Sequence, residues 1–193
     1  MDGSGKSTQI ELLLDYLKKR GHDVILTFEP TDKKIGKLLT EFYLKKVDMP
    51  IVDAFLFAAD REEHLKTLVI PALNQEKIVI SDRYYHSTLA YQSTQGLELN
   101  WLVEMNKSFI KPHLTIIVDS SPEACIERIE KDGKRKIKAR VKFEKLEFLK
   151  KLRNNYLMLP SALKDEKIIV VNGDRSKEEV HQEIIKEVSK LLA

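Results

Sequence analysis

Short apolar runs alternate with longer amphipathic segments along most of the chain. Four runs rich in branched residues, which we expect to be strands, lie at residues 22–28, 77–81, 113–119 and 167–171. Segments with apolar residues three and four positions apart, the spacing typical of helices, lie between and around these runs. We expect helices at residues 5–20, 33–46, 51–75, 98–109, 121–132, 143–158 and 176–192, and a further one near Ser87.

This alternation predicts the fold class. Continuous apolar strands separated by helices are typical of a parallel sheet that is covered by helices on both faces. We therefore predict a three-layer α/β fold. Ligands of such folds bind beyond the carboxyl ends of the strands, so the polar residues after Phe28, Ser81, Asp119 and Val171 are the candidates for a site.

Composition excludes several classes of protein. The chain has 193 residues, 42% of them apolar and 33% charged, as expected of a single globular domain over residues 1–193. Its net charge of +3 is too small to indicate nucleic-acid binding. We expect no membrane segment and no secretion signal. The single Cys125 excludes an internal disulfide and fits the reducing cytoplasm, where we expect the protein to be located.

The stretch DGSGKST, residues 2–8, matches the second half of a phosphate-binding loop, whose full signature is G-x-x-x-x-G-K-[ST]. Glycines let such a loop turn its N–H groups toward phosphate oxygens, the lysine reaches the β and γ phosphates, and the serine can bind Mg²⁺. A glycine turn that merely precedes a helix explains the motif poorly. The residues that we expect to bind ATP here are Gly3, Ser4, Gly5, Lys6, Ser7 and Thr8.

The first glycine of that signature, and the strand that should carry the loop, would precede Met1. In phosphate-loop folds this strand lies inside the sheet, and unsatisfied backbone groups cost about 1–3 kcal/mol each. We therefore expect Met1 to be an internal position, preceded by roughly ten residues that form an apolar strand ending in glycine. The complete sheet would then have about five strands.

Two further segments carry candidate chemistry. Asp82 and Arg83 follow a predicted strand, where a carboxylate can hold Mg²⁺ and an arginine can bind phosphate oxygens with its fork; a surface ion pair is the alternative. Residues 133–142 are a basic stretch with little periodicity. They form either a solvated loop or a lid that brings Arg135 and Arg140 to the transferring phosphates.

Taken together, these segments resemble the thymidylate kinase family of nucleoside-monophosphate kinases over nearly the whole chain. The matching segments are DGSGKSTQ (2–9), LFAADREEH (56–64), SDRYYHSTLAYQ (81–92), the basic residues before Phe143, and NGDRS (172–176). The resemblance implies that the γ-phosphoryl group of ATP is transferred to dTMP with Mg²⁺, which gives dTDP and ADP. It also implies a homodimer. A kinase for another small (deoxy)nucleotide and a nucleotide-binding protein with weakened catalysis remain as alternatives.

The resemblance also implies roles for single residues. Phe57 would stack on the thymine ring, Arg61 would bind its carbonyl edge or the nearby phosphate, and Tyr91 would exclude a 2′-hydroxyl. The other residues implied in acceptor binding are Asp2, Glu29, Arg83, Thr88 and Gln92. Those implied near ATP, beyond the loop, are Arg128, Asn172 and Asp174. The catalytic charges would be Lys6, Arg83, Arg135 and Arg140, and the metal ligands Ser7 and Asp82.

The chain departs from the family pattern at two places. Gly3 stands where one branch of the family has an arginine, which resembles the branch that carries its catalytic arginines in the lid. Phe28-Glu29-Pro30 stands where the family commonly has Arg-Glu-Pro, so an arginine for the acceptor phosphate is missing. Lysines at 33, 34 or 37 could compensate as point charges, without a bidentate fork, and we expect weaker monophosphate binding.

Overall fold

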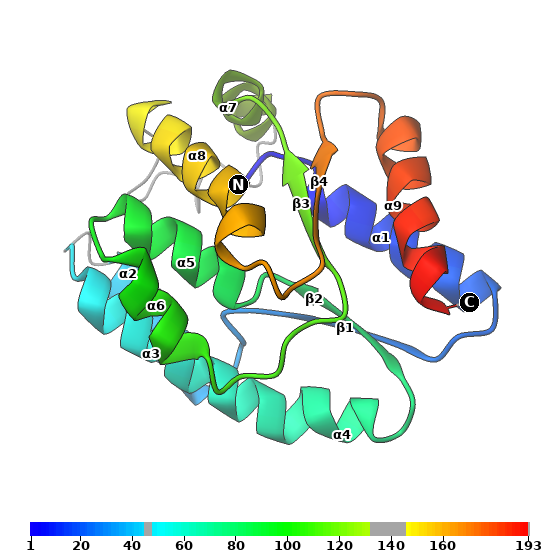
Figure 1. Ribbon diagram of the computed structural model, residues 1–193, viewed down its shortest axis with the longest axis horizontal. Helices are drawn as coiled ribbons and strands as arrows, with labels where there is room; N and C mark the ends of the chain where they lie inside the picture. Colours follow the sequence, from blue (N-terminus) through cyan, green and yellow to red (C-terminus); the bar gives the residue numbers. More distant parts are fainter. Residues whose placement is uncertain (45–47, 132–145, 193) are drawn as a thin grey trace. The chain divides into compact units, whose positions relative to one another are not determined.

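Strands and helices alternate along the chain as the sequence predicts (Figure 1). The computed structural model describes residues 1–44, 48–131 and 146–192. Its strands are β1 (Val24–Phe28), β2 (Ile78–Asp82), β3 (Thr115–Asp119) and β4 (Ile168–Asn172). Its helices are α1 (Lys6–Lys19), α2 (Lys34–Leu44), α3 (Pro50–His64), η1 (Leu65–Val69), α4 (Ile70–Leu73), α5 (Tyr85–Thr94), α6 (Leu99–Asn106), α7 (Pro122–Lys131), α8 (Leu146–Ala162) and α9 (Lys177–Leu192).

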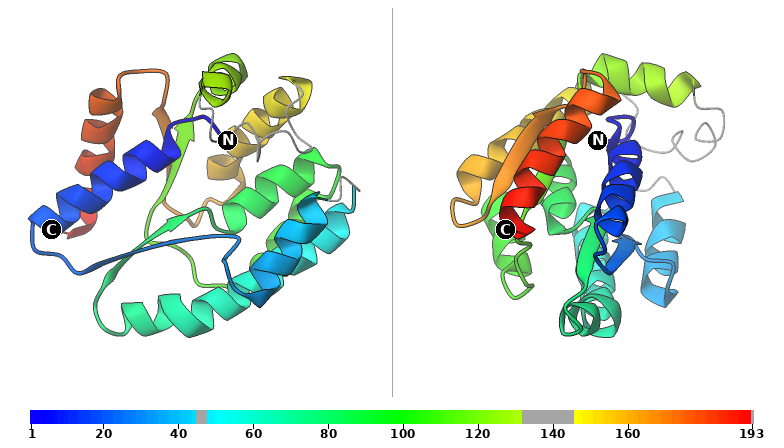
Figure 2. Two further views of the ribbon diagram at one scale, coloured as in Figure 1. Left: turned by 180° about the vertical axis from the view of Figure 1, so that it is seen from behind. Right: turned by 90° about the vertical axis from the view of Figure 1, so that its right-hand side faces the viewer.

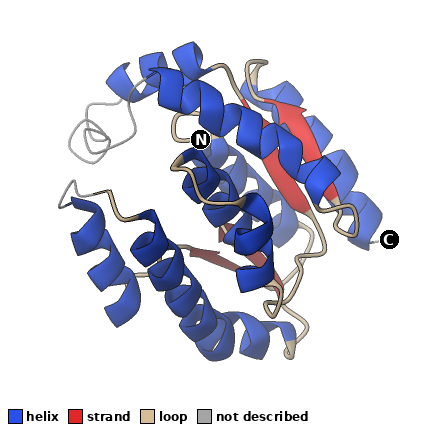
Figure 3. Cartoon of the chain, turned by 60° about the vertical axis from the view of Figure 1, so that its left-hand side comes forward, coloured by secondary structure: helices blue, strands red, loops and turns tan. Residues whose placement is uncertain are grey.

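The four strands form two parallel pairs, which Figure 3 shows in red. β1 pairs with β2 from Val24 opposite Ile78 to Phe28 opposite Asp82. β3 pairs with β4 from Thr115 opposite Ile168 to Asp119 opposite Asn172. The predicted parallel pairing is thus confirmed. In each pair both carboxyl ends lie at the same edge, so the polar residues that follow the two strands are neighbours.

The chain divides into two compact units. Unit 1 comprises Met1–Leu13 and Lys111–Ala193, and unit 2 comprises Leu14–Ile110, so α1 continues from one unit into the other. In unit 1, α8 and α9 both pack against β4, one on either side of the β3–β4 pair (Figure 2). In unit 2, α3 packs against α2, α5 and α6. The single domain predicted for residues 1–193 concerns both units together and stays a prediction.

Apolar side chains, most of them from helices, form a core in each unit. Leu17, Leu39, Leu89 and Leu102 are at most 1% exposed in unit 2, as are Leu152, Leu159 and Val171 in unit 1. The strands are less covered, and Leu26, Phe28 and Val170 remain 43%, 52% and 38% exposed. Across the described ranges, no helix combines the length and the apolar character needed to span a bilayer.

The helix predicted at 51–75 is present but widens in its middle. A π-helical turn, η1, lies between α3 and α4, and the N–H of Ile70 donates to the carbonyl of Leu65, five residues earlier. Pro71 explains the change, because proline has no N–H to donate to the carbonyl of Thr67 and its ring crowds that carbonyl. Helical periodicity alone could not show this turn, since the apolar positions continue across it.

Gly36, in α2, lies so close to the chain at Thr31 that an added Cβ would be 2.0 Å from the Thr31 carbonyl oxygen. Thr31 is held in place, because its N–H and its hydroxyl donate to the Asp60 carboxylate at 2.8 and 2.6 Å. We expect Gly36→Ala to lower the free energy of unfolding by about 1–3 kcal/mol through overpacking, as measured by urea denaturation. Lys37→Ala, at the exposed next position, is the control and should change it by less than about 0.5 kcal/mol. Equal values for the two variants would contradict the prediction.

Candidate functional site

The predicted phosphate loop lies in unit 1 and leads directly into α1. Gly3 and Gly5 have φ values of +77° and +94°, in the left-handed region that glycine adopts without steric cost. Lys6 begins α1 and Ser7 follows in its first turn, so the loop ends at a helix N-terminus. The Lys6 ammonium is 3.9 Å from the Asp2 carboxylate. Unpaired N–H groups and the helix dipole make such a terminus suitable for binding a phosphate.

Arg128, on α7, ties this loop to the segments that follow β3 and β4. Its Nη1 donates to the Gly3 carbonyl at 3.3 Å and to the Ser120 hydroxyl at 3.1 Å. Its Nη2 donates to the Gly173 carbonyl at 3.2 Å and lies 3.4 Å from an Asp174 carboxylate oxygen. The Arg128 side chain therefore holds the loop in place, and its implied contact with ATP stays a prediction.

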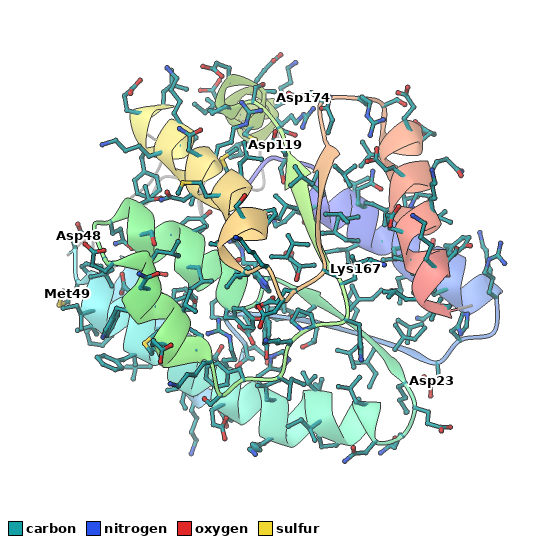
Figure 4. The ribbon with its side chains drawn as sticks, viewed as in Figure 1. Asp23, Asp48, Met49, Asp119, Lys167 and Asp174 are labelled. Carbon is teal, nitrogen blue, oxygen red and sulfur yellow. The ribbon has the colours of Figure 1, made fainter. Side chains whose placement is uncertain are left out.

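The carboxyl ends of β3 and β4 carry two aspartates, both labelled in Figure 4. Asp174 accepts a hydrogen bond from the Ser121 N–H at 2.9 Å, and its own N–H donates to the Asn172 side chain at 3.0 Å. Asp119 accepts two hydrogen bonds of 2.7 Å from Arg153 of α8, which raise the pKa of Arg153. Sequence reasoning gave Arg153 no role, because nothing in its own segment points to a partner at the end of β3.

Unit 2 holds the residues implied in acceptor binding apart from Asp2, and Arg61 contacts two of them. Phe57 and Arg61 are one turn apart on α3, and the Arg61 side chain is 1% exposed. Its Nε and Nη2 lie 3.0 and 2.8 Å from one oxygen of Glu29, which follows β1. Nη1 donates to the Asn106 side chain at 2.8 Å and Nη2 to the Thr88 hydroxyl at 3.2 Å. Three implied site residues, Glu29, Arg61 and Thr88, are thus brought together.

Sequence reasoning missed two members of this cluster, His64 and Asn106. His64 Nδ1 lies 3.0 Å from the second oxygen of Glu29, and Nε2 lies 2.7 Å from the Thr27 hydroxyl. The available signal was the spacing of Arg61 and His64, which places two basic side chains on one face of a helix. Nothing local marked Asn106, because it lies 45 positions from Arg61 at the end of a different helix.

The implied base-pocket residues of α5 lie on one face of that helix. Thr88 and Gln92 are buried and one turn apart, and Tyr91 is half-buried beside them. The Gln92 amide donates to Gln95 at 2.9 Å, and the Gln95 amide donates to Asp48 at 2.7 Å. The part of Gln92 in binding an acceptor stays a prediction.

The Asp82-Arg83 pair lies at the carboxyl end of β2. Asp82 is its last residue, and the Asp82 carbonyl accepts from the N–H of Glu29 at 3.1 Å. Arg83 has a φ of +74°, which is costly for a residue with a Cβ, and its guanidinium lies 5.2 Å from the ring centre of Tyr91. The Ser81 hydroxyl donates to the Arg83 carbonyl at 2.7 Å. Backbone strain at the end of a strand is a feature of functional sites.

Arg135 and Arg140, the lid arginines, lie outside the described residues. For the magnesium site, no cluster of three or more His, Cys, Asp or Glu side chains occurs within residues 1–44, 48–131 and 146–192. The hydroxyl of Ser7, in unit 1, and the carboxylate of Asp82, in unit 2, are each hard oxygen donors of the kind that Mg²⁺ prefers, and their joint role as metal ligands stays a prediction.

Phe28 stands where the family commonly has an arginine, so the side chain at this position carries no charge. Phe28 is 52% exposed and lies opposite Asp82. Of the lysines that could compensate, Lys33 donates through its ammonium to the Thr67 hydroxyl, while Lys34 and Lys37 are exposed on the first turn of α2.

Comparison with known proteins identifies relatives along nearly the whole chain. The family model described as thymidylate kinase matches residues 1–184. A "Probable thymidylate kinase" of Thermococcus onnurineus is 43% identical over 195 residues, which cover 96% of this chain and 92% of the relative. A "Probable thymidylate kinase" of Thermococcus kodakarensis is 41% identical, and the match covers 100% of this chain and 95% of the relative. A "Thymidylate kinase" of Bacillus cytotoxicus is 39% identical, and the match covers 99% of this chain and 95% of the relative.

The two loop glycines differ in their surroundings, and this difference can be tested. A Cβ on Gly3 would lie 2.4 Å from the carbonyl oxygen of Cys125, whereas a Cβ on Gly5 would meet nothing within 4 Å. Both alanine variants should lose stability because of the positive φ, by about 1–2 kcal/mol. Gly3→Ala should lose about 1–3 kcal/mol more, since α7 would have to move. Chemical denaturation of both variants measures the difference, and a Gly5→Ala variant as unstable as Gly3→Ala would refute it.

Proposed function

Because the chain belongs to the thymidylate kinase family, we propose that it transfers the γ-phosphoryl group of ATP to dTMP, which gives dTDP and ADP. The observation that carries this proposal is the phosphate loop, in which two left-handed glycines lead to Lys6 and Ser7 at the N-terminus of α1. The relatives are named thymidylate kinase or probable thymidylate kinase, which supports the choice of acceptor.

We assign the donor nucleotide to unit 1. The backbone of Gly3 to Thr8 would bind the phosphates, with Lys6 at the β and γ phosphates. Arg128, Asn172 and Asp174 would lie beside the remainder of ATP. Their mutual hydrogen bonds support this assignment, because they fix the loop after β4 to the phosphate loop.

We assign the acceptor to unit 2. Phe57 would stack on the pyrimidine, Thr88 and Gln92 would line its pocket, and Tyr91 would lie under the deoxyribose. Arg61 would donate to a carbonyl of the base. This role fits the side chain, because Nη1 carries two N–H groups and makes one hydrogen bond, to Asn106, among the residues that the structure describes. Asp2, in unit 1, would contact the sugar hydroxyl or the metal shell.

Catalysis would rest on charge rather than on a general base, since the acceptor is already a phosphate oxygen. Lys6, Arg83 and the lid arginines Arg135 and Arg140 would neutralise the charge of the moving group. Ser7 and Asp82 would hold Mg²⁺, which when bound offsets phosphate charge as a Lewis acid.

We further propose a homodimer in the cytoplasm. The location rests on Cys125, which is the single cysteine and is buried. Burial raises the pKa of its thiol, so this cysteine is poorly reactive.

The dimer is supported by apolar side chains on the outer face of α3 and α6. Ile51, Phe55 and Trp101 are 52%, 55% and 40% exposed, and the rings of Phe55 and Trp101 meet edge to face at 5.9 Å. Exposed apolar clusters of this kind mark protein interfaces.

Lys6→Met tests the proposed reaction. We expect kcat for dTMP-dependent ADP release to fall by about 10²–10³, because the charge on the transferred group loses a fixed partner. Lys18→Met, at the exposed end of the same helix, is the matched control and should retain wild-type turnover.

The same assay separates the alternatives when dTMP, dUMP and thymidine are compared as acceptors. Comparable or faster turnover of dUMP or thymidine would favour a kinase for another small acceptor. Wild-type protein that binds ATP but releases no ADP with dTMP would favour a nucleotide-binding protein without this catalysis.

Phe55→Asp tests the dimer. A charge in an apolar interface should dissociate it, and we expect sedimentation velocity to show a shift from dimer to monomer. Met158→Asp places the same charge on α8, at a side chain that is 56% exposed, and should leave the dimer intact. A monomeric wild-type protein, or a Phe55→Asp variant that still dimerises, would contradict this assignment.

A further inference from the structure

A continuous chain of polar contacts connects the strand β1 to Arg61 inside unit 2. The Thr27 hydroxyl lies 2.7 Å from His64 Nε2, His64 Nδ1 lies 3.0 Å from one Glu29 oxygen, and the other oxygen lies 2.8 Å from Arg61 Nη2. All four residues are buried, and the side chains of Glu29, Arg61 and His64 are at most 2% exposed. These contacts are therefore largely shielded from bulk water.

The two oxygens of Glu29 have different partners. Oε2 faces Nε and Nη2 of Arg61, and Oε1 faces His64 alone among the hydrogen bonds of the described residues. A carboxylate only accepts, so His64 Nδ1 is the donor in this contact and carries the proton. The imidazole thus fixes the rotation of the carboxylate, and the rotation of the carboxylate decides where Oε2 meets the guanidinium.

The guanidinium of Arg61 has no other anionic partner in the hydrogen bonds and ion pairs of the described residues. Its further hydrogen-bond acceptors are neutral, the side chains of Asn106 and Thr88. Aromatic rings of Tyr84 and Phe109 lie 5.3 and 5.5 Å from its central carbon. Because hydrogen bonds to charged groups are the stronger ones, Glu29 is the partner that sets the direction of the fork.

We propose that His64 is a positioning residue for the acceptor nucleotide: it orients the Glu29 carboxylate, which in turn orients the Arg61 guanidinium. The inference rests on the proposed function, since it takes Arg61 as the group that faces the acceptor. It extends that function to a residue that touches no substrate. His64 acts on acceptor binding and leaves the binding of ATP, which we assign to unit 1, unaffected.

Two substitutions of His64 separate this role from simple support of the fold. The amide nitrogen of asparagine takes the place of an imidazole Nδ1, so His64→Asn can still donate to Glu29 but loses Thr27. The amide nitrogen of glutamine takes the place of Nε2, so His64→Gln keeps a hydrogen bond with Thr27, whose hydroxyl then accepts, but loses Glu29. Each variant loses one of the two contacts of the ring, and we expect the thermal unfolding midpoint to fall further in His64→Gln, which loses the bond to the charged partner; the KM for ATP then serves as the control for a general loss of structure.

Steady-state kinetics of the full chain with dTMP and ATP then give the decisive comparison. We expect His64→Gln to raise the KM for dTMP by about tenfold and to leave the KM for ATP within about twofold of wild type. His64→Asn should keep the KM for dTMP within about threefold, because the bond to the charged partner is retained. If His64→Gln does not fold, His64→Phe fills the same space without either bond and should raise the KM for dTMP at least as much.

Two results would overturn the inference in distinguishable ways. Equal KM values for dTMP in the asparagine and glutamine variants, or KM values for dTMP and ATP that rise together with the loss of stability, would show that His64 only supports the fold. In that case wild-type turnover of dTMP would leave the proposed function standing. Absence of dTMP-dependent ADP release in the wild type would overturn the proposed function and, with it, the positioning role of His64.

Discussion

The buried ion pair of Glu29 and Arg61 is the contact around which unit 2 is organised. A carboxylate and a guanidinium removed from water lose several kcal/mol of hydration each, and only close pairing with full hydrogen bonding compensates for the loss. The requirement joins four elements, because Glu29 follows β1, Arg61 lies on α3, Thr88 on α5 and Asn106 on α6. Loss of either charge would leave the other buried and unpaired, at a cost of about 3–5 kcal/mol. The helices of unit 2 are thus fixed to one another by the group that, in the proposed function, would face the acceptor.

In unit 1, close packing and hydrogen bonds to carbonyl groups hold the phosphate loop in place. The phosphate loop is held mainly by close packing at glycines, since an added Cβ would lie 2.4 Å from the Cys125 carbonyl oxygen at Gly3 and 3.0 Å from the Ser4 carbonyl oxygen at Gly173. Arg128, which is only half-buried, adds hydrogen bonds to carbonyl groups of Gly3 and Gly173. A loop that binds phosphate must keep its N–H groups available for the ligand. Fixing it through its carbonyl oxygens and through glycine contacts meets that need, whereas a buried carboxylate would compete with the phosphate.

Structural elements that have a local sequence pattern could be predicted, whereas contacts between residues far apart in the sequence could not. Strands, helices and the phosphate loop follow from local periodicity and a motif, and their positions agree with the structure to within a few residues. The Glu29–Arg61–His64 cluster joins residues 32 and 35 positions apart, and no local pattern specifies that these charges face each other. The π-helical turn at Leu65–Val69 was missed for a different reason, since Pro71 changes the hydrogen bonds of the helix and leaves its apolar pattern intact. The roles implied for Arg135 and Arg140 depend on a segment outside the described residues.

The phenylalanine at position 28 shows how the internal pairs shape the charge offered to an acceptor. Arg61 is positively charged, but Glu29 balances that charge at 2.8 Å, so the pair as a whole contributes little field to a phosphate. In the proposed function the acceptor phosphate would depend on Arg83 at the end of β2, since Phe28 stands in place of an arginine and Arg20 lies just beyond the C-terminal end of α1. Lys34 and Lys37 can add only unoriented charge. In the proposed function the two arginines would therefore have separate tasks: Arg61, paired with Glu29, would face the neutral base, and Arg83, held at a strained φ of +74°, would face the anion.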